Sequence, residues 1–317
     1  MEMLFQFQLP LMLFFQNIET IFLDTTSEII TVFGESPIPL LITVFIYWCW
    51  DKKKGFVVVS SLLSAMMSMQ ILKAIFRIPR PFMKYPELIQ GKRQQTATGF
   101  SFPSGHSTTA SSFYGGLCYS FKQKWIRALS IALIVLVPIS RLYLGVHWPM
   151  DILIGTLIGL VSAFALGRVF EKLYRDEKAF MIYTILFALV TLLIALPLAI
   201  VMDVNTLNYA TLAEFKATTL YRAIHNLMQN SAIAAGIFAG MALDRKTLKF
   251  VPAQSAKTRI LSLVAGLLML AVVALALTAI PVAKYTFEFL TLAFVGIWVT
   301  YLFPLIATKL KLMEKEN

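Results

Sequence analysis

The sequence predicts an all-α membrane protein, a polytopic bundle of transmembrane helices. Of its 317 residues, 58% are hydrophobic and only 14% are charged, against about 25% charged residues in a typical soluble domain. Several apolar runs approach or exceed the roughly 17 to 25 residues that cross a bilayer as a helix. The abundance and length of these runs exclude a soluble protein with one large core.

The N-terminal segment, residues 1–35, is expected to lie at the membrane interface or to form a tilted first crossing. Residues 3–16 are apolar but short for a span, and Pro10 interrupts them. Residues 17–35 mix apolar side chains with carboxylates, a composition that suits an interfacial helix. These carboxylates are Glu19, Asp24, Glu28 and Glu35.

Nine transmembrane spans are predicted after this segment. They share an apolar composition and are separated by polar or charged stretches. The expected ranges are 36–50, 56–76, 104–121, 125–143, 151–171, 181–202, 219–243, 259–281 and 286–308.

A charged run divides these spans into two blocks. It reads Glu171-Lys-Leu-Tyr-Arg-Asp-Glu-Lys178, and it separates a first block, residues 36–171, from a C-terminal block of four membrane helices, residues 178–317. Each block contains a small-xxx-small pattern, which favours close packing of helices within the chain. These patterns are Gly155-Thr-Leu-Ile-Gly159 and Gly236-Ile-Phe-Ala-Gly240.

The distribution of basic residues predicts the orientation in the membrane. Most of the 28 lysines and arginines fall in alternate loops and in the tail, which the positive-inside rule assigns to the cytoplasm. Residues 73–103, 141–150 and 203–218 are then expected on the extracytoplasmic side, in a bacterial cytoplasmic membrane. Cytoplasmic loops and lipid headgroups account for the net charge of +11, so no nucleic-acid partner is expected.

The first candidate functional stretch is Gly99-Phe-Ser-Phe-Pro-Ser-Gly-His106. Ser104 is a good N-cap, and the free N–H groups at a helix start form an anion site beside His106. Gly105 would let a ligand approach the backbone closely. Taken alone, a Ser-Gly-His at a helix start is more often only a cap, and this interpretation stays open.

The second candidate stretch is Lys73-Ala-Ile-Phe-Arg-Ile-Pro-Arg-Pro81. Arg80 lies between two prolines, where the stiff backbone aims its planar guanidinium, and Lys73 adds a point charge for phosphate oxygens. The alternative is that both are snorkelling anchors at the interface. Arg77 and Lys84 are expected to be interface charges.

The third candidate stretch is Ser140-Arg-Leu-Tyr-Leu-Gly-Val-His-Trp-Pro-Met-Asp151. Arg141 ends one predicted helix, His147 lies in the short loop, and Asp151 begins the next helix. A carboxylate near an imidazole holds its tautomer and leaves the other nitrogen free to attack. Alternatively, Asp151 only caps its helix and His147 is an incidental loop histidine.

The three stretches lie at the outward ends of different helices, so their side chains can converge in one pocket. Together they resemble the type 2 phosphatidic acid phosphatase (PAP2) superfamily, which shares its site with glucose-6-phosphatase and the vanadium haloperoxidases. The family pattern is a lysine, six residues and Arg-Pro; then Pro-Ser-Gly-His; then Ser-Arg, five residues, His, three residues and Asp. The chain matches this pattern without departure, and the resemblance covers roughly residues 36–171.

The resemblance implies a PAP2/haloperoxidase-like catalytic core and a role for each matched residue. His147 would be the nucleophile that forms a phosphohistidine, Asp151 would orient it, and His106 would protonate the leaving group. The phosphate oxygens would be held by the other matched residues, namely Lys73, Arg80, Ser104, Gly105 and Arg141. No metal and no other cofactor are implied.

The implied function is hydrolysis of a phosphate monoester or diphosphate of a membrane lipid, such as a prenyl diphosphate, a phosphatidylglycerol phosphate, a phosphatidate or a sphingoid phosphate. A basic rim of Lys84, Lys92 and Arg93 is expected to favour substrates with more than one negative charge. The alternatives are a glucose-6-phosphatase-like sugar phosphatase and a non-hydrolytic transporter of an anionic lipid. The expected partners are the lipid substrate and the bilayer, and the sequence gives no prediction of the oligomeric state.

The C-terminal block carries no chemical assignment from the sequence. His225, its single histidine, is expected to have a packing or interface role. Both cysteines of the chain, Cys49 and Cys118, lie in apolar runs and are expected to be packing residues without a disulfide.

Overall fold

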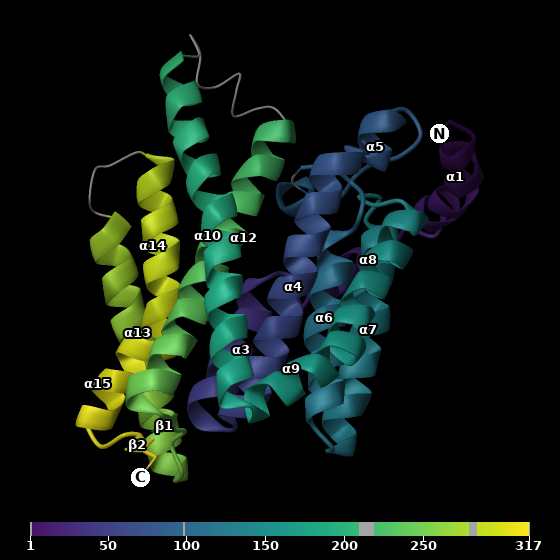
Figure 1. Cartoon of the computed structure of the whole chain (residues 1–317). Coiled ribbons are helices and arrows are strands. Elements are labelled where there is room, and N and C mark those ends of the chain that lie inside the picture. The colour runs from purple at the N-terminus through teal and green to yellow at the C-terminus, as the bar shows by residue number, and fades with distance from the viewer. Residues whose placement is uncertain (1, 98, 209–218, 279–283, 317) are drawn as a thin grey trace. The chain divides into compact units, whose positions relative to one another are not determined.

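The chain folds almost entirely into helices, which confirms the predicted all-α class (Figure 1). The computed structural model describes residues 2–97, 99–208, 219–278 and 284–316. The elements up to residue 175 are α1 (Glu2–Asn17), α2 (Ile21–Val32), α3 (Pro37–Cys49), α4 (Lys52–Phe76), α5 (Pro81–Lys84), the 3-10 turn η1 (Gln94–Thr96), α6 (Gly105–Ser120), α7 (Lys124–Tyr143), α8 (Pro149–Val161), the π-helical turn η2 (Ser162–Leu166) and α9 (Gly167–Arg175).

The second half of the chain continues with long helices. Its elements are α10 (Glu177–Asn208), α12 (Thr219–Leu243), the π-helical turn η3 (Asp244–Leu248), β1 (Phe250–Val251), α13 (Ala256–Thr278), α14 (Tyr285–Ile297), the π-helical turn η4 (Trp298–Leu302), α15 (Phe303–Lys309) and β2 (Glu314–Lys315). The two short strands pair antiparallel, with Phe250 opposite Lys315.

All nine predicted spans coincide with helices over their described residues, but fewer qualify as crossings. Residues 279–281 of the predicted span 259–281 and residues 209–218 of the predicted loop 203–218 lie outside the described residues. Within the described residues, six helical stretches are long and apolar enough to cross a bilayer, or seven if α2 and α3 form one bent span. On this criterion the expected number of nine was too high. The helix α6 shows why, because it is rich in Ser, Thr and Gly and ten of its 16 residues are buried. Small residues such as these are enriched where helices of a membrane protein pack closely, and they lower the hydropathy of the helix.

The described residues form two compact units. The first unit draws on residues 1–41, 57–169 and 218–223, and the second on residues 42–56, 170–217 and 224–317. Residues 42–56, expected in the first block, thus pack within the second unit. The units are units of packing, and the division into functional domains at 1–35, 36–171 and 178–317 stays a prediction.

Glycines bring α8 against α6 in the first unit. A Cβ atom added at Gly155 would lie 2.7 Å from the carbonyl oxygen of Ser104, and one at Gly159 would lie 2.6 Å from Cβ of Ser111. The two backbones therefore approach to a distance that only glycine permits, and the predicted small-residue packing is confirmed. The contact sets the first turns of α6 and α8 side by side, where Ser104 N–H donates to the Asp151 carbonyl over 2.9 Å.

The second unit uses the same device between α12 and α14. A Cβ atom at Gly236 would lie 1.9 Å from the carbonyl oxygen of Ala293, so the predicted close contact is again made within the chain. Nearby on these helices, Nε2 of His225 lies 2.8 Å from Oε2 of Glu288. Gln229 donates to the other oxygen of that carboxylate over 2.6 Å. His225 therefore joins two helices, in line with the packing role expected for it. Both cysteines are free.

We expect Gly159→Ala to destabilise the first unit. The added methyl group would overlap Ser111 on α6, and overpacking of this kind costs about 1–3 kcal/mol. The measurement is the thermal unfolding midpoint Tm of the purified protein. The matched control is Gly167→Ala, whose methyl group would meet the Tyr119 ring at an ordinary 3.4 Å. The first variant should have a lower Tm than the wild type and the second should not; equal values would contradict the packing described.

Candidate active site

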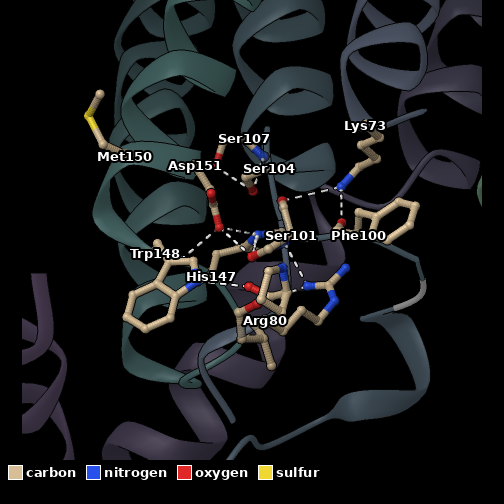
Figure 2. A network of polar contacts seen from close by, with 12 residues as sticks. Lys73, Arg80, Phe100, Ser101, Ser104, Ser107, His147, Trp148, Met150 and Asp151 are labelled. Carbon is tan, nitrogen blue, oxygen red and sulfur yellow. Dashed lines mark hydrogen bonds and ion pairs between the residues drawn. The ribbon is translucent and has the colours of Figure 1, made fainter. Parts of the chain in front are cut away.

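The three sequence motifs meet in the first unit, at the ends of its helices (Figure 2). Each motif residue is placed where a helix starts or stops, so its side chain is held by a helix while the surrounding loops can approach it. Lys73 lies in the last turn of α4, Arg80 is the N-cap of α5, Ser104 is the N-cap of α6, Gly105 and His106 begin α6, Arg141 lies in the last turn of α7, His147 lies in the turn before α8, and Asp151 lies in the first turn of α8.

The Asp151 carboxylate joins three parts of the site. Its Oδ2 accepts the backbone N–H of Trp148 over 2.8 Å and the hydroxyl of Ser101. The same oxygen lies 3.3 Å from Nδ1 of His147. Because Trp148 is the N-cap of α8, Asp151 satisfies a free helix N–H and also faces the histidine. Asp151 therefore caps α8 and lies beside His147, while its expected role in orienting a nucleophile stays a prediction.

A glycine shapes the turn that carries His147. Gly145 has a φ of +68°, a left-handed conformation that costs glycine little. A Cβ atom there would also lie 2.7 Å from the carbonyl oxygen of Gln90. The sequence Gly145-Val-His147 therefore requires its glycine both for the backbone angle and for the approach of the neighbouring loop.

The contacts of His147 indicate which ring nitrogen carries the proton. Nη1 of Arg80 lies 3.1 Å from Nε2 of His147. Arginine only donates hydrogen bonds, so Nε2 must be the acceptor and the proton lies on Nδ1, towards Asp151. Burial, together with the cations Arg80, Lys73 and Arg141, holds the pKa of His147 well below its usual range. His147 is thus a neutral imidazole whose Nε2 lone pair faces the cationic group.

Two of the buried cations are held by backbone carbonyl groups of the loop before α6 and of the turn before α8. Nζ of Lys73 donates to the carbonyl oxygens of Phe100 and Ser101. Nε of Arg80 donates to the Gly99 carbonyl over 3.1 Å, and its Nη1 donates to that of Val146 over 2.8 Å. These contacts fix both cations before any ligand binds, in sites that are almost fully buried.

Arg141 and His106 each keep at least one buried polar atom that makes no hydrogen bond to the described residues. Nη1 of Arg141 donates to Oγ1 of Thr31 over 2.9 Å. Its Nε and Nη2 are buried and make no hydrogen bond to the part of the chain that the structure describes, and the same holds for Nε2 of His106. Buried donors without partners cost free energy, so an anion that accepts hydrogen bonds from these atoms would be bound favourably.

The start of α6 has the predicted cap. Oγ of Ser104 lies 3.4 Å from the N–H of Ser107 and accepts the Ser107 hydroxyl over 3.0 Å. A Cβ atom at Gly105 would meet only Met69, at an ordinary 3.6 Å. Packing therefore gives no reason for a glycine at this position, and its expected role beside a ligand stays a prediction.

The sequence reasoning missed three residues that lie among the predicted ones. Ser101 bonds the Asp151 carboxylate, and its Oγ is 3.4 Å from Nδ1 of His147. Thr31 bonds Arg141, and Oε1 of Glu35 lies 3.9 Å from Nε2 of His106. Ser101 stood inside a stretch already singled out. Thr31 and Glu35 belong to the N-terminal segment, where no local pattern distinguishes them.

The expected basic rim is wrong, because acids of the N-terminal segment neutralise it. Lys92 pairs with Asp24 at 2.7 Å and with Glu19 at 2.9 Å. The other two pairs are Lys84 with Glu2, at 2.8 Å, and Arg93 with Glu35, also at 2.8 Å. The sequence argument counted only charges within the loop, whereas folding brings residues 2–35 alongside it.

The donor set of this site is cationic and imidazole-based. Within the described residues there is no group of three or more His, Cys, Asp or Glu side chains that could hold a metal ion. The arrangement offers a neutral imidazole lone pair, a second imidazole and fixed cations around one position, which together can bind an anion and attack it.

Comparison with known proteins agrees with the motifs. The PAP2 superfamily profile matches residues 54–175. A second profile, the transmembrane extension of PAP2 superfamily phosphatases, matches residues 228–315. The Escherichia coli K12 protein named "Putative undecaprenyl-diphosphatase YbjG" is 30% identical over 51% of this chain and 80% of its own length. The chain belongs to the PAP2 superfamily. With its apolar helices and the matched extension, it is a multi-pass integral membrane protein.

Other PAP2 relatives match over shorter stretches. An undecaprenyl-diphosphatase of Sulfolobus acidocaldarius is 34% identical over 36% of this chain, a match that spans only 53% of that protein. Phosphatidylglycerophosphatase B of Bacillus subtilis is 38% identical over 26% of this chain and 44% of its own length. The second PAP2 profile gives the helices within residues 228–315 a place in the superfamily, although the sequence alone gave them no chemical assignment.

Proposed function

We propose that this PAP2 protein hydrolyses a phosphate monoester or diphosphate of a membrane lipid through a phosphohistidine formed at His147. The observation that supports this most directly is the state of His147, a neutral imidazole with Nδ1 towards Asp151 and Nε2 towards Arg80. An imidazole in this state can attack phosphorus, whereas a histidine that only packs has no need of a fixed lone pair.

In the first step, Nε2 of His147 attacks the phosphorus atom, and the bond between phosphorus and the leaving oxygen breaks. His106 gives its proton to that oxygen. The positive charge that develops on the His147 ring is stabilised by Asp151 through the Nδ1 proton. In the second step, His106 takes a proton from water, the hydroxide attacks the phosphohistidine, and inorganic phosphate leaves with His147 restored.

The cations stabilise the transferring phosphoryl group. Lys73 and Arg80 are already fixed by loop carbonyls, so little reorganisation is needed when charge shifts to the equatorial oxygens. Nη1 of Arg80 donates a hydrogen bond to Nε2 of His147 in this structure, and this group would move to a phosphate oxygen as substrate binds. The unused donors of Arg141, together with the amide of Gly105, would take the remaining oxygens.

The proposed substrate class is a lipid, with a prenyl diphosphate first and a phosphatidylglycerol phosphate second. Two of the relatives named above carry the name undecaprenyl-diphosphatase, for YbjG with the word putative, and one is named phosphatidylglycerophosphatase B, which supports this order. A site at helix ends lets a phosphate enter while its apolar chain stays in the bilayer. The charge of the loop 84–93 gives no support, since its cations are paired.

We expect His147→Ala and His106→Ala each to abolish turnover without loss of folding. The first removes the nucleophile and the second the proton donor, and neither role has a substitute in the site. Phosphate release from a lipid phosphate in detergent measures activity, and Tm measures folding. Turnover close to wild type in either folded variant would refute the mechanism. Lipid binding without hydrolysis in the wild type would instead favour a transporter.

A substrate comparison tests the lipid assignment. Release of phosphate would be measured in one detergent for undecaprenyl diphosphate, phosphatidylglycerol phosphate, phosphatidate, sphingosine 1-phosphate and glucose 6-phosphate. We expect the lipids to react faster, with the diphosphate fastest, because an apolar chain can stay in the detergent phase. A preference for the sugar phosphate would favour the glucose-6-phosphatase-like alternative.

We further propose that the site faces the extracytoplasmic side of a bacterial cytoplasmic membrane. The exposed residues Gln95 and Lys124 lie near opposite ends of the first unit's helices, and the positive-inside rule assigns the second to the cytoplasm. In a background without Cys49 and Cys118, Gln95→Cys should react with an impermeant thiol reagent in intact cells and Lys124→Cys should not. The reverse labelling pattern would overturn this orientation.

A further inference from the structure

The turn between α2 and α3 packs directly on His106. A Cβ atom at Gly34 would lie 2.5 Å from Cγ1 of Val137, and 3.2 Å from both Cβ and the carbonyl oxygen of His106. No side chain fits at residue 34, so the backbone of this turn rests on the first turn of α6. The N-terminal segment is therefore part of the wall of the site.

The next residue in this turn directs a carboxylate at the imidazole. Oε1 of Glu35 lies 3.9 Å from Nε2 of His106. This separation is too long for a hydrogen bond but short for a charge interaction. The same oxygen accepts from Nη2 of Arg93 over 2.8 Å. Arg93 therefore holds Glu35 in place, and the pair keeps its carboxylate on the side of His106 that carries the unused nitrogen.

The charges around His106 explain why this carboxylate matters. Burial lowers the pKa of His106, the cations Arg141 and Arg80 lower it as well, and the Glu35 carboxylate raises it. Arg93, from the loop, pairs with Glu35, and neutral His147 lies beside Arg80. Each cation disfavours a proton on the buried His106 ring. Within the described residues, Glu35 is the carboxylate that faces this ring, while Asp151 is engaged by His147 and Ser101.

The segment contacts the site at a second point, one helical turn earlier. Oγ1 of Thr31, fully buried on α2, accepts from Nη1 of Arg141 over 2.9 Å. Thr31 and Glu35 are four residues apart, so one stretch of backbone places both groups. This contact orients Arg141 so that its two free donors and Nε2 of His106 remain available to a ligand.

We propose that Glu35 is a positioning residue that keeps the proton on Nε2 of His106 for donation to the leaving oxygen. The inference rests on the proposed function. A proton donor must be protonated when the bond to phosphorus breaks, and a facing carboxylate extends the protonated form to higher pH. Glu35 acts through His106 and bonds neither phosphorus nor the leaving group.

The first test is the pH dependence of kcat in Glu35→Gln. The kcat should fall above the pH at which His106 loses its proton, which forms the basic limb of the pH profile. Removing the carboxylate should move this limb to lower pH by about one unit. KM should stay level or fall, because a negative charge near the phosphate is lost. The matched control is Glu28→Gln, an exposed acid of α2, which should match the wild type. Glu35→Asp, which keeps the charge, should leave the limb nearer its original position.

The second test varies the leaving group. A nitrophenol leaves without protonation, whereas a lipid alcohol does not. Glu35→Gln should therefore lose about tenfold in kcat on a lipid alkyl phosphate at a pH above its shifted limb, and little on a nitrophenyl phosphate. Equal losses on both substrates would assign Glu35 a structural role only, and an unmoved basic limb would overturn the proposal outright.

The two proposals fail in different ways. If the wild type releases phosphate, His147→Ala does not, and Glu35→Gln keeps both the wild-type limb and the wild-type leaving-group dependence, only the role of Glu35 is refuted. If the wild type hydrolyses none of the substrates, the proposed function itself is refuted. If Glu35→Gln has a lowered Tm, Glu35→Asp is the variant to compare. A basic limb of the pH profile that is shifted as far in Glu35→Asp as in Glu35→Gln would refute a role for the charge.

Discussion

The structure of the site depends on one carboxylate in the first turn of α8. Asp151 accepts from Trp148, from Ser101 and from the ring of His147, and its carbonyl accepts the N–H at the start of α6. One residue thus ties together a helix start, the loop before α6 and the turn after α7. The Asp151 carboxylate is buried close to Lys73 and Arg80 and opposes part of their charge.

Burial of so many cations would be unfavourable if the protein did not solvate them. Lys73 and Arg80 are solvated by backbone carbonyl groups rather than by carboxylates, so they are held in place while the site keeps an excess of positive charge. A carboxylate partner for each would have neutralised that excess. The donors on Arg141 and His106 that find no partner among the described residues then mark where an anion can relieve the excess of positive charge.

Much of this could be predicted from the sequence, because the information is local. The motifs fix which residues end one helix and begin the next, and apolar runs fix where the helices lie. Gly155 and Gly159 were readable as a packing face for the same reason. The contacts that escaped prediction join distant stretches: Thr31 meets Arg141 across 110 positions, and Arg93 meets Glu35 across 58. No spacing rule links residues so far apart, so the loop charges were counted without their partners.

Those distant contacts change the significance of the N-terminal segment. Its ion pairs with the loop are partly exposed, and exposed pairs contribute only about 0–1 kcal/mol each, so they cannot anchor the segment by strength alone. Close packing at Gly34 and the buried bond from Arg141 to Thr31 supply a rigid attachment. The ion pairs of the attached segment neutralise Lys84, Lys92 and Arg93 of the loop, and one of them places the Glu35 carboxylate beside His106. Because the loop is neutralised, the buried cations are the main attraction for a phosphate.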